Sequence, residues 1–178
     1  MIYSLSEIDA NCKKAARGAG LAWGYAEEAG KAARWLAAHQ LPGAALLADY
    51  LTLRRESPED YRGADAGCPL IMGASLCDAG RNEGEESIVL ARVVSPLLLL
   101  PYLVQLSRAA GMGLRIQWSG THISCHEGVI YIEENASITA SKATVVSCDW
   151  LAADACASIN ISAQKKGAVG QFIEPSDW

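Results

Sequence analysis

The stretch ARGAGLAWGYAEEAGKAARWL, residues 16–36, determines how the N-terminal half of the chain folds. Gly18 and Gly20 interrupt a helical pattern, because glycine readily adopts the positive φ angle of a helix C-terminus. A second helical pattern begins near Ala22 or Trp23 and runs to His39. It carries a stripe of small residues, which lets another helix approach closely: Ala26, Ala29, Gly30, Ala33 and Ala37. The sequence therefore predicts two packed helices joined by a glycine-rich corner.

Helical signals continue on both sides of this corner. Ser4 and Glu7 have the spacing of a capping box, in which each side chain binds the other residue's backbone N–H. This predicts a first helix from there to about Arg17. Pro42 is well placed in the first turn of a third helix that runs to about Arg54. Residues 1–56 are therefore expected to form a helical lobe.

The region from about residue 57 to 86 is rich in Gly, Asp, Glu and Pro. We predict a long irregular connection that contains one short ordered segment, PLIMGASLC, at residues 69–77. A connection of this length in a compact domain is typical of a functional lid or of a boundary between lobes.

The second half has strand signals around one helix. Ser87–Val94 is rich in β-branched residues and predicts a strand. Ser95 as N-cap and Pro96 in the first turn predict a helix that ends at Gly111, while Pro101 either kinks this helix or marks its true start. Short strands are expected further along, with a hairpin turn at Ser119–Gly120: residues 114–118, 121–125, 129–133, 142–148 and 157–163.

Together these patterns predict an α+β fold. An N-terminal layer of about three helices is followed by a strand–helix unit and a small antiparallel sheet, with one face packed and the other in water. We expect a single domain over residues 1–178, with an α+β lobe at about 87–178.

Composition excludes several classes of function. A net charge of −5 argues against broad nucleic-acid binding and against docking on anionic lipid. Lys13, Lys14 and Arg17 cluster, but on a helix face that we expect to lie in water. No membrane helix is expected, because the longest charge-free stretch, Val93–Ser107, is too short and contains two prolines. No signal peptide is expected, because the N-terminal MIYSLSEID has no basic region followed by an apolar stretch. Six cysteines without a C-x-x-C pair are typical of reduced thiols, so we expect a cytoplasmic protein.

Parts of this sequence resemble a known family. Lys14–Gly20 reads KAARGAG, Trp23–Gly24 follows, and Ala26–Gly30 reads AEEAG. This pattern, together with VVSPLLLLPYL at residues 93–103, is similar to that of a family of small proteobacterial proteins of unknown function. The resemblance implies a bacterial protein and supplies no activity.

The glycine-rich corner is the first candidate site. The N–H groups at a helix start favour anions, so a small anionic ligand is an expected partner, although no nucleotide-binding fingerprint is present. Glu27 and Glu28 are candidate acid/base residues, and because neighbours on a helix point about 100° apart, only one of them can face a given cleft. The alternative is a tight helix–helix corner without a ligand. The candidate ligand-binding residues are Arg17, Gly18, Gly20, Trp23 and Gly24.

The segment HISCHE, residues 122–127, is the second candidate site. On a strand His122 and His126 face the same way but lie about 13 Å apart, which is too far for one metal ion without bending. Cys125 faces the other side, so a Cys–His nucleophile pair is not expected. We therefore predict polar residues on the wet face of a hairpin, and no metal.

These observations favour a cytosolic accessory or small-ligand-binding protein that self-associates. The small-residue stripe and the apolar run Leu97–Leu100 are the features that favour a homo-oligomer. The alternative is a small-metabolite enzyme, or an enzyme subunit, that uses Glu27 or Glu28 as acid/base. No cofactor is expected.

Overall fold

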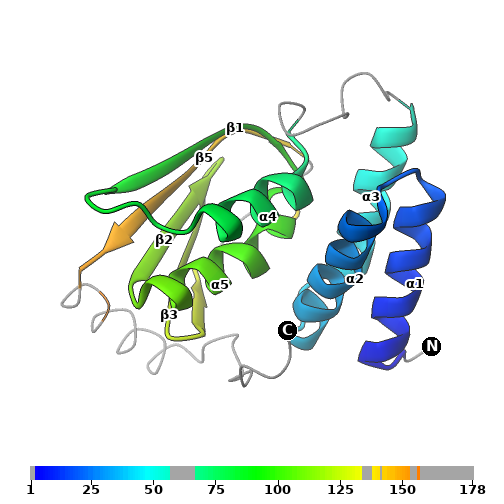
Figure 1. Ribbon diagram of the computed structural model, residues 1–178, viewed down its shortest axis with the longest axis horizontal. Coiled ribbons are helices and arrows are strands. Elements are labelled where there is room, and N and C mark those ends of the chain that lie inside the picture. The colour runs from blue at the N-terminus through cyan, green and yellow to red at the C-terminus, as the bar shows by residue number, and fades with distance from the viewer. Residues whose placement is uncertain (1–2, 57–66, 134–137, 141, 153–155, 157–178) are drawn as a thin grey trace.

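The computed structural model describes residues 3–56, 67–133, 138–140, 142–152 and 156. Figure 1 shows three layers: helices α1, α2 and α3 on one side, helices α4 and α5 in the middle, and an antiparallel sheet on the other side. The predicted α+β class is confirmed. The helices are α1 (Leu5–Gly18), α2 (Trp23–Ala38), α3 (Gly43–Glu56), α4 (Pro69–Ala79), η2 (Pro96–Leu99, a 3-10 turn) and α5 (Leu100–Ala110). The strands are β1 (Ser87–Val94), β2 (Gly113–Trp118), β3 (Thr121–His126), β4 (Val129–Ile132) and β5 (Lys142–Leu151).

The predicted start of α1 is confirmed. The Glu7 amide donates to Ser4 Oγ at 3.2 Å, and the Ser4 amide donates to Glu7 Oε2 at 2.8 Å, so the capping box is complete. These bonds lower the pKa of the Glu7 carboxyl, because they favour its charged form. Gly20 ends the turn after α1 with φ of +84°.

Helix α2 is the centre of the helical layer. Four of the five residues of its small-residue stripe are buried, with Ala26, Ala29 and Ala33 at 0% exposure, and Ala37 is partly buried. A side chain at Gly30 would lie 2.4 Å from Asp9 Oδ1 in α1, so α1 and α2 are held closer there than an alanine would allow. The small residues of this stripe therefore serve packing within the chain.

Helix α4 differs from the prediction for its region. The segment 69–77 was expected to be a short ordered piece of an irregular connection, and it forms part of an eleven-residue helix. Pro69 lies in its first turn, and Gly80 ends it with φ of +67°. Its apolar residues follow no clear helical period, and the helix packs against α2, η2 and α5. Residues 57–66 of the connection lie outside the described part of the chain.

The apolar run before α5 forms the centre of the core. Leu97, Leu98, Leu99 and Leu100 are each at most 1% exposed. Pro101 marks the true start of the α-helix and does not kink it, since α5 begins at Leu100. The predicted N-cap role of Ser95 is wrong: this residue has φ of +45° and its side chain makes no capping bond.

The sheet has the strand order β1-β5-β2-β3-β4, and all pairs are antiparallel. Ile116 of β2 lies between Cys148 and Ile123, and all three are buried against the helices. The alternate residues form the opposite, open face, as predicted. The turn at Ser119–Gly120 has two positive φ angles, +43° and +79°, which match the twist of a tight hairpin. The strand predicted at residues 157–163 lies outside the described residues.

The largest cluster of buried apolar side chains contains residues of both halves, from Cys12 in α1 to Cys148 in β5. Among the described residues, none of the helices is long and apolar enough to cross a membrane.

Candidate functional site

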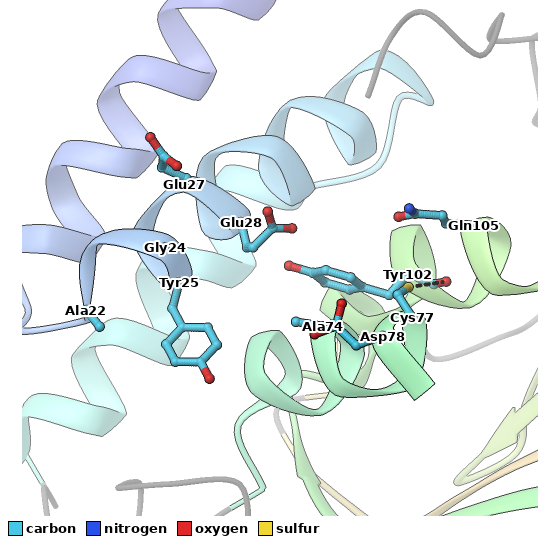
Figure 2. A pocket seen from close by; sticks show the side chains of 10 residues that line it. All are labelled: Ala22, Gly24, Tyr25, Glu27, Glu28, Ala74, Cys77, Asp78, Tyr102 and Gln105. Carbon is cyan, nitrogen blue, oxygen red and sulfur yellow. Dashed lines mark hydrogen bonds between the residues drawn. The ribbon is translucent and has the colours of Figure 1, made fainter. Parts of the chain in front are cut away.

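A pocket of about 410 Å³ opens between α2, α4 and α5, where the helical layer meets the middle layer. This volume lies toward the lower end of the range of about 300–1,000 Å³ that is usual for small-molecule sites. Figure 2 shows the side chains that line it: Ala22, Gly24, Tyr25, Glu27 and Glu28 from the start of α2, Ala74, Cys77 and Asp78 from α4, and Tyr102 and Gln105 from α5.

The two adjacent glutamates of α2 point in different directions. Glu27 turns toward α1, where its Oε1 accepts a hydrogen bond from Lys13 Nζ at 2.8 Å. Glu28 turns toward Tyr102 across the pocket (Figure 2), and its Oε1 lies 2.8 Å from Lys31 Nζ one turn along α2. As predicted from helix geometry, only one of the two faces the middle of the cleft.

The charge state of Glu27 follows from its partner. The hydrogen bond from Lys13, with the positive charge of the same side chain, holds the pKa of Glu27 below its ordinary value of 4.5. Glu27 is therefore ionised at neutral pH, and its paired oxygen is occupied. A general base that works near neutrality needs a pKa near the working pH, so Glu27 is poorly suited to that role.

Tyr102 forms the floor of the pocket. It is 2% exposed, and Figure 2 shows its hydroxyl directed toward Glu28. Burial, and to a smaller extent the negative charge of Glu28, raises the pKa of the phenol, so Tyr102 stays protonated. Its ring lies directly on Gly73 of α4, where a Cβ atom would be 2.4 Å from Tyr102 Cδ2. Gly73 therefore sets the position of this ring.

Helix α4 supplies the opposite wall. The Cys77 thiol donates to the Tyr102 carbonyl oxygen at 3.4 Å. Burial raises the pKa of Cys77 to about 11, with smaller contributions from Asp78 and Glu28, so the sulfur is a neutral thiol and a weak nucleophile at neutral pH. Asp78 is exposed and lies at the rim. This wall therefore offers a carboxylate and a polarizable thiol, and no activated nucleophile.

The pocket is acidic. Glu27, Glu28 and Asp78 are carboxylates, and none of the described residues that line it is Lys, Arg or His. The described residues also contain no group of three or more His, Cys, Asp or Glu side chains arranged to hold a metal ion. The arrangement is suited to binding a small polar or positively charged molecule next to aromatic rings.

Most of the predicted ligand-binding residues lie beside this pocket and not in it. The Trp23 side chain is on the surface, 60% exposed, with Lys13 Nζ 4.9 Å and Arg17 Cζ 5.5 Å from its ring centre. Arg17 Nη1 also donates to the Leu21 carbonyl oxygen at 2.5 Å, which fixes the turn between α1 and α2. Gly18 and Gly20 do not line the pocket. Of the five candidates only Gly24 does, together with both glutamates.

The sequence analysis did not identify seven of the lining residues, of which Ala22 directly precedes α2. Tyr25 lies one turn before Glu28 on the same helix, and that i, i+3 spacing is a signal that could have placed it at the site. The others come from two helices much later in the chain, and no local pattern links them to α2: Ala74, Cys77, Asp78, Tyr102 and Gln105.

The residues of the second predicted site lie on opposite faces of the sheet. His122 and His126 lie on the open face of β3 and are half-buried, whereas Cys125 is fully buried on the packed face. Burial raises the pKa of Cys125 to about 12. The opposite orientation of Cys125 and the histidines agrees with the prediction from strand alternation.

Comparison with known proteins gives one match. A family model described as a protein of unknown function (DUF3726) matches residues 3–88, which include α2 and α4 but not α5. This is consistent with the expected resemblance to an uncharacterised family, while the sequence motif and the proteobacterial origin stay predictions. Neither the curated proteins nor the solved structures contain a match to this chain.

Proposed function

We propose that this protein binds a small molecule in the pocket between α2, α4 and α5. The observation that carries the proposal is the pocket itself. Three helices from separate parts of the chain place two tyrosines and three carboxylates around one space of about 410 Å³. Small-molecule sites typically combine such a concave, partly aromatic wall with a few convergent polar groups.

Binding without catalysis accounts for the chemistry of the site better than the enzyme alternative does. The acid/base role expected for Glu27 or Glu28 requires a carboxylate whose pKa lies near the working pH. The pKa of Glu27 is lowered by Lys13, and one oxygen of Glu28 is bound to Lys31. Cys77 and Tyr102 are both held in their neutral forms. We therefore assign an accessory or ligand-binding role, in a cytoplasm where the six free thiols would stay reduced.

The expected anionic ligand belongs to the corner between α1 and α2, which is a separate place. Arg17 is the cation there, and it already contacts the Leu21 carbonyl and the face of Trp23. An anion at the corner would compete with these contacts. The pocket, with its carboxylates, would repel an anion, so an anionic ligand is the weaker of the two candidates.

Self-association is retained as part of the proposal, but on a different surface from the one expected. Leu97–Leu100 and all of the small-residue stripe except the partly buried Ala37 are buried within the chain. Val89 and Val145 are 65% and 47% exposed, and they lie on neighbouring strands on the open face, with β1 at the edge of the sheet. Sedimentation velocity would test this surface: Val89→Lys should shift an oligomer to monomer, and a monomeric wild-type protein would end this part of the proposal.

The ligand-binding role is tested by a thermal-shift screen of the full chain against amines, carboxylates, phosphates and amino acids. A bound compound should raise the midpoint by mass action. Ala74 lines the pocket, so Ala74→Leu should fill it and abolish the shift. Ala79→Leu, at the exposed end of the same helix, is the matched control and should keep the shift. If no compound class raises the midpoint, or if Ala74→Leu leaves the shift unchanged, the proposal is wrong.

A further inference from the structure

The charges next to the pocket are arranged so that positive side chains turn away from it. Lys13 is bound to Glu27 and stacks on Trp23, on the α1 side of α2. Arg17 also lies over Trp23. These two cations are thus held on the outer surface, while a third, Lys31, lies 2.8 Å from Glu28 Oε1 but does not line the space between α2, α4 and α5, whose charged lining residues are all carboxylates.

Glu28 is the carboxylate best placed to meet a ligand. Its side chain is 26% exposed, whereas its partner Lys31 is 44% exposed and does not line the pocket. A surface ion pair of this kind contributes little to stability, because both groups are well solvated when apart. A ligand cation can therefore replace Lys31 at Glu28 while the lysine returns to water.

Aromatic rings complete a cation-binding arrangement. Tyr25 comes from α2 and Tyr102 from α5, and both line the pocket together with Glu28, whose side chain is directed toward Tyr102 (Figure 2). The negative faces of aromatic rings attract an ammonium group within about 6 Å, and more strongly when water is excluded. Since Tyr102 and Cys77 are neutral, they add polar and polarizable contacts without adding a charge.

From this combination we infer that the pocket binds a small organic cation, a primary amine on an apolar or aromatic body, with Glu28 as its counter-ion and Tyr25 and Tyr102 as its walls. The inference rests on the proposed ligand-binding role of the same pocket and names the class of ligand. The ligand inferred for this pocket has the opposite charge to the anion expected at the corner between α1 and α2.

Three probes of nearly equal size and different charge separate this inference from simple pocket binding: benzylamine, benzyl alcohol and benzoate. Each is titrated into the ¹⁵N-labelled full chain, and the amide shifts are followed by NMR. Benzylamine should shift the amides of residues 22–28, 74–78 and 102–105, and benzoate should not. Benzylamine should also slow the alkylation of Cys77 by iodoacetamide, since this thiol lines the same space.

Substitutions then identify the counter-ion. Glu28→Gln should weaken benzylamine binding about tenfold, the loss typical of one hydrogen bond to a charged group. Glu83→Gln makes the same change in net charge at an exposed residue outside the pocket, and it should leave the affinity unchanged. The ¹⁵N spectra of both variants report directly whether the fold is retained.

The outcomes distinguish the two proposals. If benzoate binds as tightly as benzylamine at the same amides, or if Glu28→Gln and Glu83→Gln bind benzylamine equally well, the cation inference is overturned while the ligand-binding role stands. If none of the three probes shifts the pocket amides and the thermal-shift screen is also negative, both proposals are overturned.

Discussion

Gly73→Ala tests whether the pocket floor is positioned as described. The added methyl group would lie 2.4 Å from Tyr102 Cδ2 and 2.5 Å from its Cγ, and ordinary contact begins near 3.4 Å. The ring or helix α4 must therefore move by about 1 Å. Tyr102 is 2% exposed, so its ring is already in contact with other side chains over most of its surface.

The magnitude follows from two opposing effects. Overpacking of this kind costs about 1–3 kcal/mol, while replacing a mid-helix glycine by alanine returns about 0.5–1 kcal/mol. We expect a net destabilisation of up to about 2.5 kcal/mol, which lowers the thermal midpoint of a domain of this size by up to about 10 °C. The displaced ring should also weaken benzylamine binding.

A matched substitution gives the opposite sign. Gly24 also lies in a helix that lines the pocket, but a Cβ atom there would have nothing within 4 Å. Gly24→Ala should be neutral or should stabilise the protein by up to about 1 kcal/mol. The assay is urea unfolding followed by circular dichroism, with both variants measured against wild type.

Removing the ring provides the decisive comparison. In a Tyr102→Ala background the close contacts with Cδ2 and Cγ no longer exist, so Gly73→Ala should lose most of its cost. The reasoning would be refuted if Gly73→Ala is as harmless as Gly24→Ala in the wild-type background, or if its cost is the same with and without the Tyr102 ring.

Two further predictions concern the contact between α1 and α2. Gly30→Ala should destabilise the protein by about 1–3 kcal/mol, because its Cβ would lie 2.4 Å from Asp9 Oδ1 and 2.9 Å from the Asp9 carbonyl oxygen. Gly18→Ala is the control and should not destabilise the protein, because a Cβ there would have nothing within 4 Å. Equal urea midpoints of the two variants would contradict this prediction. Glu27→Gln should flatten the acid limb of the stability–pH profile. The lowered pKa of Glu27 means that its ion pair stabilises the fold above pH 4.5 and that this contribution is lost as the pH falls through the lowered value. Lys13→Gln should give the same flattening, and an unchanged acid limb in either variant would show that the pair does not contribute.

The N-terminal helices and most strands could be predicted because their signals are local. The capping box at Ser4 and the alternation of Leu114, Ile116 and Trp118 each depend on residues a few positions apart. Helix α4 could not be predicted because it lacks such a local signal. It packs against α2, η2 and α5, and its apolar side chains follow no single helical stripe. At Ser95 the local signal was present but did not decide the structure. The sequence Ser95-Pro96 predicts a side-chain N-cap, but Ser95 adopts a left-handed backbone conformation between β1 and η2 and makes no capping bond.

In the candidate site, too, only the residues that are close together in the sequence could be predicted. Both glutamates and Gly24 could be found because they share one turn of one helix. Tyr102 and Cys77 could not, because they reach the pocket only through the packing of α4 and α5 against α2. The corner residues Arg17 and Trp23 lie outside the pocket. Arg17 donates to the Leu21 carbonyl oxygen and lies over the Trp23 ring, and a tight, exposed turn without a ligand would use the same contacts.

The adjacency of Glu27 and Glu28 now has a physical explanation. Consecutive residues on a helix point about 100° apart, so a pair of acids gives α2 one carboxylate on each of two sides. Glu27 secures α1 through Lys13, and this same contact draws positive charge toward Trp23 and away from the pocket. Glu28 is left as the more buried carboxylate beside Tyr102. If this division holds, Lys13→Gln should affect stability with little effect on benzylamine binding, and Glu28→Gln should do the reverse. Equal effects of the two substitutions on both measurements would show that the acids act as one site.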